Sequence, residues 1–132
     1  MPPSDADAPP AGQGLAVAAE ALYLINLMLV PGLAFLILVG LWWREKGRAP
    51  ALARCHLAQT VSASLWAGGL LVAANIAIVL LGGYDAASTW VVVILWFTCV
   101  HSTLILFGVV GLARALSGKP YVYPLVGRPC RG

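Results

Sequence analysis

The chain has 132 residues, of which 61% are hydrophobic and only 10% are Asp, Glu, Lys or Arg, and its formal net charge is +3. Soluble globular domains carry about 25% charged residues, so this composition excludes that class and indicates a membrane protein. The positive charge does not indicate nucleic-acid binding, because the basic residues lie beside long apolar segments rather than along one face of a fold.

Residues 1–19 begin with MPPSDADAPPAGQG, a segment rich in Pro, Ala and Gly. So few apolar side chains cannot build a core, and we expect a disordered tail. The segment lacks the basic n-region of a signal peptide, so the apolar segment that follows is expected to be retained.

Three stretches, 21–43, 57–81 and 86–113, contain no Asp, Glu, Lys or Arg, and each exceeds the roughly 20 residues that cross a hydrocarbon core. They predict helices at about 21–43, 57–81 and 88–115. A helix satisfies its own backbone hydrogen bonds in lipid, which an isolated strand cannot do. The sequence therefore predicts an all-α membrane protein, with three transmembrane helices in a compact bundle over 20–117. Residues 118–132 are too short and too rich in Pro for a fourth span, so we expect an interfacial cytoplasmic tail.

The Lys and Arg residues indicate the orientation of these spans. They are Arg44, Lys46, Arg48 and Arg54 after the first span, and Arg114, Lys119, Arg128 and Arg131 after the third. The positive-inside rule then places the N-terminus outside and the C-terminus in the cytoplasm, as in a multi-pass protein of a bacterial inner membrane. Cys55 and Cys130 would face the cytoplasm, where thiols stay reduced.

Departures from plain apolar packing indicate where the helices meet. Pro31 should kink the first span. Small and weakly polar residues recur on one face of each later span, where they allow close approach of another helix. We expect these two faces to pack together; a substrate path is the alternative for the second span. The predicted helix-packing residues are Pro31, Ser64, Gly68, Asn75, His101, Gly108 and Gly111.

His101 is a titratable side chain within the third span. By helix rise it lies at about the same depth as Pro31 and Gly68, near the middle of the membrane. Its simplest role is a hydrogen-bonded contact between helices. Proton movement is a second reading, but the predicted spans hold no carboxylate for a relay. Haem ligation is a third, and it needs a dimer or a partner because His56 lies on the order of 20 Å away.

A polar patch begins the second span, formed by Arg54, His56, Gln59 and Thr60. We expect it to be solvated at the membrane interface. The alternative is a docking surface for a cytoplasmic partner or a lipid headgroup.

Two segments, CHLAQTVSASL and GKPYVYP, carry a family resemblance. Together they resemble small bacterial membrane proteins of the domain of unknown function 4870 family, a remote relative of the twenty-kilodalton subunit of the chloroplast inner-envelope translocon. The likeness covers roughly residues 15 to 128 and implies a compact helical membrane domain without supplying catalytic residues.

The chain carries no Ser-His-Asp set, paired carboxylates, phosphate loop or metal cluster, so we expect neither an enzyme nor a bound cofactor or metal. Three functions remain open. The first, which we favour, is a small structural or accessory subunit of a larger inner-membrane assembly. The others are a self-assembling channel or protein-translocation element, and a haem-binding electron carrier through His101. The expected partners are the lipid bilayer and a membrane protein or further copies of the chain, not nucleic acid.

Overall fold

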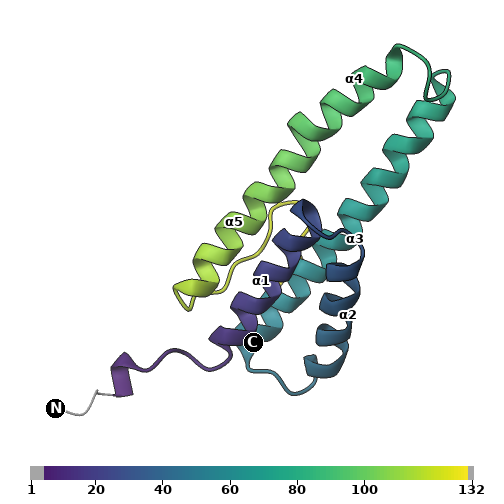
Figure 1. Cartoon of the computed structure of the whole chain (residues 1–132). Coiled ribbons are helices and arrows are strands. Elements are labelled where there is room, and N and C mark those ends of the chain that lie inside the picture. The colour runs from purple at the N-terminus through teal and green to yellow at the C-terminus, as the bar shows by residue number, and fades with distance from the viewer. Residues whose placement is uncertain (1–4, 131–132) are drawn as a thin grey trace.

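The computed structural model describes residues 5–130, and the regular elements in that range are all helical (Figure 1). This confirms the all-α prediction for the described part of the chain, while Arg131 lies outside it. Helices α4, η2 and α5 follow one another without a break and form one continuous rod. In chain order the elements are η1 (Asp5–Asp7), α1 (Gln13–Met28), α2 (Leu33–Glu45), α3 (Ala51–Leu80), α4 (Ser88–Leu95), the π-helix η2 (Trp96–His101) and α5 (Ser102–Leu116).

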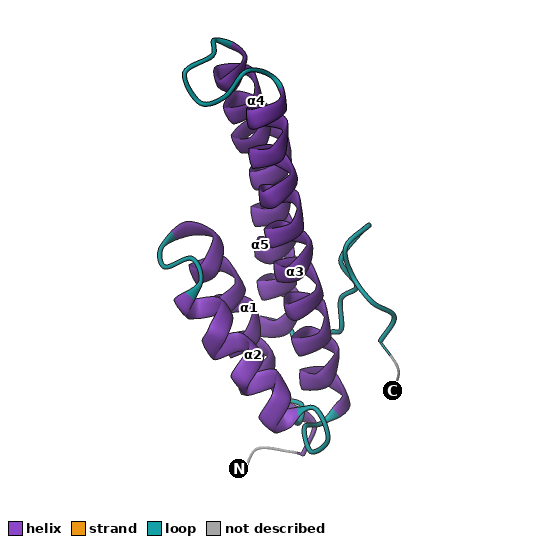
Figure 2. Ribbon diagram, turned by 90° about the vertical axis from the view of Figure 1, so that its right-hand side faces the viewer, coloured by secondary structure: helices purple, strands orange, loops and turns teal. Residues whose placement is uncertain are grey.

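The first apolar segment is a helical hairpin rather than one kinked span. Figure 2 shows α1 and α2 running side by side, joined by a tight turn. Pro31 has no N–H to continue a helix. Gly32 follows with a φ of 87°, and its N–H donates to the Asn26 side chain at 3.0 Å. These features reverse the chain and correct the prediction of a single helix over 21–43.

The two hairpin helices are short, with 16 and 13 residues. At the α-helical rise they are about 24 Å and about 20 Å long, less than the thickness of a hydrocarbon core. Helix α1 also begins at Gln13, within the predicted disordered tail.

The second and third predicted spans are present as long apolar helices. Helix α3 has 30 residues and the rod from Ser88 to Leu116 has 29, and both are long and apolar enough to cross a membrane. They are antiparallel and joined by the loop between Leu80 and Ser88. Their distal halves, residues 68–101, project beyond the rest of the molecule, and we call them the arm (Figure 1).

The remaining residues form the base, where the core lies. Helix α1 packs against α2, α3 and α5 at once. One core cluster gathers around Tyr23, Leu104 and Tyr123, and a second around Leu38 and Leu57. The base therefore holds nearly all the buried residues that the structure describes, and Ile78 is the buried residue of the arm.

Helix α1 begins at the end of the molecule that carries the basic residues. The Gln13 side-chain amide donates to the carbonyls of Ala115 and Leu116 at the end of α5. Gly12 lies against Pro50, just before α3. The prediction placed the amino end opposite the basic loop; the hairpin instead brings both to one end.

The small residues of α5 face α1 rather than α3. A Cβ atom on Gly108 would lie 2.7 Å from the Tyr23 ring, and one on Gly111 would lie 2.5 Å from the Glu20 carboxylate. This corrects the expectation that the small-residue faces of the second and third spans pack together. Close packing of helices through Gly is present, but with a different partner helix.

The C-terminal segment, residues 117–130, folds back against the base (Figure 2). Tyr123 is only 1% exposed and Val126 is also buried, both in the core cluster of Tyr23. The expected interfacial tail is thus replaced by a segment that completes the core.

Candidate functional site

Glu20 is the central residue of a buried polar cluster in the base. It is the single charged residue between Asp7 and Arg44, and its side chain is fully buried. Helix α1 directs the carboxylate toward Gly111 of α5, where the missing side chain leaves the space it occupies. A buried carboxylate is strongly unfavourable unless it is paired and hydrogen-bonded, so its partners determine whether this packing is stable.

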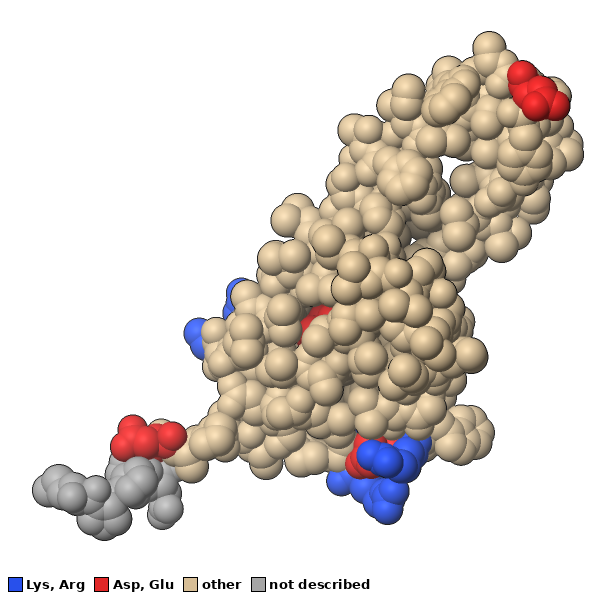
Figure 3. All heavy atoms as spheres, in the orientation of Figure 1, with Lys and Arg blue, Asp and Glu red and all other residues tan. Residues whose placement is uncertain are grey.

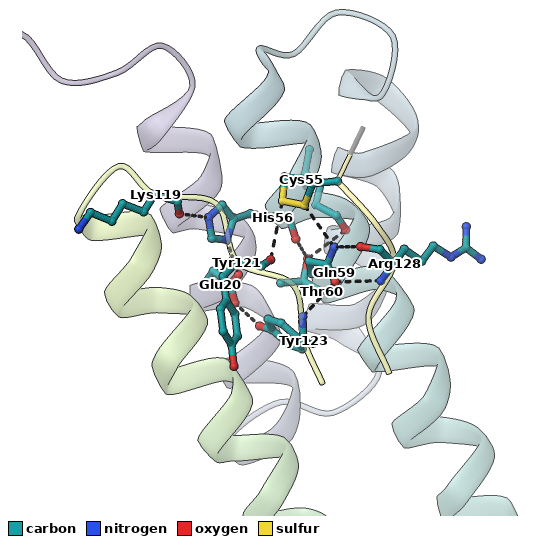
Figure 4. Close-up of polar contacts among 11 residues, drawn as sticks. Glu20, Cys55, His56, Gln59, Thr60, Lys119, Tyr121, Tyr123 and Arg128 are labelled. Atoms are coloured by element: carbon teal, nitrogen blue, oxygen red, sulfur yellow. Dashed lines mark hydrogen bonds and ion pairs between the residues drawn. A yellow bond between two sulfur atoms is a disulfide. The ribbon is translucent and has the colours of Figure 1, made fainter. Parts of the chain in front are cut away.

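His56 of α3 is the first partner (Figure 4). Its Nδ1 lies 2.5 Å from Glu20 Oε1, and its Nε2 lies 2.9 Å from the Lys119 carbonyl oxygen. A carbonyl only accepts, so Nε2 carries a proton. One further proton must lie between Nδ1 and Glu20. The pair is therefore imidazolium with carboxylate or imidazole with carboxylic acid, and it has no net charge in either state.

Gly118 directs the Lys119 carbonyl to His56. It ends α5 in the left-handed conformation, with a φ of 68°. The Lys119 N–H then donates to the Arg114 carbonyl at 2.8 Å, as in a glycine-terminated helix. The backbone leaves α5 in the direction of α3, where His56 binds it.

Tyr123 is the second partner of Glu20. Its hydroxyl donates to Glu20 Oε2, and its ring packs edge-on against Tyr23 with centroids 5.5 Å apart. Burial raises the pKa of Tyr123 far above its usual value, and the adjacent Glu20 charge raises it further. The phenol therefore stays protonated and acts as a hydrogen-bond donor.

Gln59 holds the rest of the C-terminal segment, one turn along α3. Its Oε1 accepts from the backbone N–H groups of Tyr123 at 3.2 Å and Arg128 at 2.9 Å, and its Nε2 donates to the Arg128 carbonyl. Ser62 donates to the Val126 carbonyl at 2.8 Å. A Cβ atom on Gly127 would collide with Gln59 Oε1, so only glycine fits there. Side chains of α3 thus bind the C-terminal segment mainly through the backbone N–H and carbonyl groups of that segment.

The predicted interfacial patch is therefore not a solvated surface. His56, Gln59 and Thr60 are fully buried, whereas Arg54 is exposed. Thr60 Oγ1 bonds to the His56 carbonyl of its own helix at 2.9 Å. The sequence identified three residues of the cluster, but the segment that covers them lies more than 60 positions away.

A disulfide closes the same region. It joins Cys55 at the start of α3 to Cys130, with Cα atoms 5.0 Å apart and a sequence separation of 75. This corrects the expectation that both thiols are reduced. The third cysteine, Cys99, is free and exposed.

The predicted mid-depth residues lie elsewhere, around a second feature. A hollow of about 610 Å³ opens between the turn of the α1–α2 hairpin and the arm. Pro31, Gly68 and His101 all line it, as does Ser64, whose buried Oγ has no hydrogen-bond partner. The half-exposed His101 ring stacks edge-on with Phe97, at 5.4 Å between centroids.

Asn75 lies apart from both features, in the distal part of the arm. Its amide donates to the Leu71 carbonyl and accepts from the Tyr84 hydroxyl, each at 2.8 Å. It fixes the end of the arm rather than a contact with another helix of the base.

The two histidines lie in different parts of the molecule and make different contacts. Both ring nitrogens of His56 are engaged within the cluster, and His101 faces the hollow. Among residues 5–130 no group of three His, Cys, Asp or Glu side chains could hold a metal ion. The chemistry the cluster supports is internal: it shares one proton and fastens the C-terminal segment to α1 and α3.

Sequence reasoning missed Glu20 and Tyr123. Glu20 carried a usable signal, since it is a lone acidic residue in a long apolar stretch. Tyr123 carried no such signal, because its neighbouring residues do not distinguish a tyrosine that returns to the core from one at a membrane surface.

Comparison with known proteins identifies one family. The model of the Magnetosome magnetite crystal formation protein family matches residues 13–129. The resemblance to the domain of unknown function 4870 family and to the translocon subunit was therefore wrong. No curated protein and no solved structure matches the chain.

Proposed function

The chain belongs to the Magnetosome magnetite crystal formation protein family, and on that premise we propose that it is a small accessory protein embedded in the bacterial membrane where magnetite forms. Its role would be structural: it contributes a fixed scaffold to a larger assembly in that membrane. The observation that carries the membrane part of this proposal is the chemistry of the arm.

The arm is apolar on nearly all sides. Between Cys55 and Ala113 the sequence holds one charged residue, Asp85, at the tip. Trp90 is 70% exposed and Leu80 is 80% exposed. Figure 3 shows an arm with no charged side chain below its tip on the face in view. Soluble monomers rarely expose apolar patches larger than a few hundred Å², so this surface favours insertion into lipid.

The opposite end of the molecule is basic. Arg44 lies in the last turn of α2, Lys46 and Arg48 follow it before α3, and Arg114 lies in the last turn of α5. On the face that Figure 3 shows, the Lys and Arg side chains lie on the base and not on the arm. Basic residues at one end of a pair of apolar helices favour a cytoplasmic position for that end. The accessory role is supported by the use of the buried polar groups, because Glu20 takes its partners from within the chain.

Two charge-inserting variants test the membrane part of the proposal. Val72 lies in the arm and is 59% exposed. Val72→Lys would therefore place an ammonium group in hydrocarbon, which costs about 2.5–3.5 kcal/mol of insertion free energy. Asp85→Lys at the tip is the control. We expect wild type and the control to resist alkaline extraction from membranes, while Val72→Lys accumulates poorly there. Recovery of the wild-type protein in the soluble fraction would refute the proposal.

The role in magnetite formation is tested in a magnetite-forming bacterium. Deletion of the gene should change the size or number of crystals seen by electron microscopy, and the wild-type gene should restore them. Val72→Lys should fail to restore them. A gentle-detergent pull-down should recover one membrane partner at fixed stoichiometry. Crystals that are unchanged by the deletion would exclude the role.

A further inference from the structure

The hollow between the hairpin turn and the arm has the features of a binding site. Its volume of about 610 Å³ lies within the range of pockets that hold drug-sized molecules. It is separate from the Glu20 cluster, and no step of the proposed function uses it.

Ser64 supplies the first argument. It is 5% exposed, and its Oγ is the one buried side-chain oxygen or nitrogen in residues 5–130 without a hydrogen-bond partner. A helical serine or threonine can bond to the carbonyl four residues before it, as Thr60 does with His56. An unpaired buried hydroxyl is unfavourable. A ligand oxygen in the hollow would satisfy it.

Aromatic rings supply the second argument. Phe35 of α2 and the residues Trp96, Phe97 and His101 of η2 all line the hollow. Single π-helical turns inside α-helices occur frequently at functional sites, and here the π-helix carries three of these rings. Such a wall favours a flat ring over a flexible acyl chain, because aromatic rings stack with defined geometry.

The hollow also has open space beside Gly68 and no permanently charged residue in its lining. Gly68 also lines the hollow, and a Cβ atom built on it would meet nothing within 4 Å. The lining contains no Asp, Glu, Lys or Arg. His101 is the one titratable side chain in the lining, so a phosphate headgroup or an ion would lack a permanently charged partner there, which favours a neutral ligand that enters from lipid.

We propose that this hollow binds a neutral, lipid-soluble molecule of the quinone class, whose ring lies against Trp96 and Phe97 and whose carbonyl oxygen accepts a hydrogen bond from Ser64. The lining of the hollow carries the binding site itself, while entry of the ligand from lipid rests on the membrane location proposed above. Binding in detergent tests the site without that location.

Decylubiquinone is the probe, titrated into the purified full chain in detergent while tryptophan fluorescence is followed. Trp96 lines the hollow and Trp66 does not, so Trp66→Phe is the matched control for Trp96→Phe. We expect saturable quenching in wild type and Trp66→Phe, and only linear, collisional quenching in Trp96→Phe. Linear quenching in wild type would overturn the proposal.

Two further variants test the chemistry of binding. Ser64→Ala should weaken binding about tenfold without lowering the melting temperature, since it removes an unpaired hydroxyl. Gly68→Leu should block binding by filling the hollow. Ser62→Ala is the control: it loses the bond to Val126, so its melting temperature should fall while its affinity is unchanged. Unchanged affinity in both Ser64→Ala and Gly68→Leu, or equal competition by decylbenzene, which has no carbonyl, would refute the site.

Discussion

Glu20 shows how one residue fixes the base. Its carboxylate joins α1 to His56 of α3 and to Tyr123 of the C-terminal segment. Replacing Glu20 with Ala would leave the His56 Nδ1 and the Tyr123 hydroxyl buried without a partner. Breaking a buried pair in this way costs about 3–5 kcal/mol.

We therefore expect Glu20→Ala to lower the free energy of unfolding by about that amount, measured by denaturant titration in detergent. Glu45→Ala is the matched control, because Glu45 pairs with the exposed Arg44 and such pairs contribute about 0–1 kcal/mol. Equal losses in the two variants would show that the buried pair contributes no more than a surface one.

Tyr123 gives the cluster a pH dependence at high pH. Its folded-state pKa is raised above the ordinary value of 10.0, by burial first and then by Glu20. Above about pH 10 the unfolded chain loses the phenol proton while the folded chain keeps it, so stability falls as pH rises. Below that pH the contribution is fully present.

The measurement compares wild type with Tyr123→Phe. The advantage of wild type, about 1–3 kcal/mol at neutral pH from the hydrogen bond to Glu20, should shrink as the pH passes about 10. A difference that stays constant up to about pH 11 would contradict a raised pKa for Tyr123.

At the scale of the element, glycine positions decide which helices pack. Gly111 has no room for a side chain, since a Cβ atom would lie 2.5 Å from Glu20 Oε2, whereas Gly40 of α2 has nothing within 4 Å. We expect Gly111→Ala to destabilise the fold by about 1–3 kcal/mol through overpacking. Gly40→Ala should instead stabilise it by about 0.5–1 kcal/mol. Thermal unfolding in detergent tests both variants. Unchanged stability in Gly111→Ala would show that α1 lies further from α5 than the structure has it.

The long apolar helices could be predicted from sequence because length and absence of charge are local properties. The hairpin could not be predicted so simply, since Pro31 is compatible with either a kink or a reversal. The reversal depends on Gly32 adopting a positive φ and on Asn26 capping its N–H. The buried cluster was only partly predictable: His56 and Gln59 stood out as polar, but their partners lie far away in sequence. Glu20 lies in α1, and the other partners lie in the C-terminal segment.

At the scale of the whole molecule, the hairpin changes which ends share a side of the membrane. Three full spans would place residue 11 and residue 47 on opposite sides. With α1 and α2 as a hairpin, both lie at the basic end, because Gln13 bonds to the end of α5 and α2 returns to Glu45. The tip of the arm, with Asp85, lies at the other end (Figure 3).

Single cysteines at three exposed positions distinguish the two arrangements. Ala11→Cys, Gly47→Cys and Asp85→Cys are each made with Cys55, Cys99 and Cys130 replaced by Ala, so that the introduced cysteine carries the thiol that is labelled. A maleimide that cannot cross lipid should label Asp85→Cys in intact spheroplasts. It should reach the other two only in inverted vesicles, because the positive-inside rule predicts a cytoplasmic position for the basic end. Labelling of both Ala11→Cys and Asp85→Cys in intact spheroplasts would support the three-span arrangement instead of the hairpin. The first apolar segment would then cross the bilayer, and Glu20 could not keep its place beside His56.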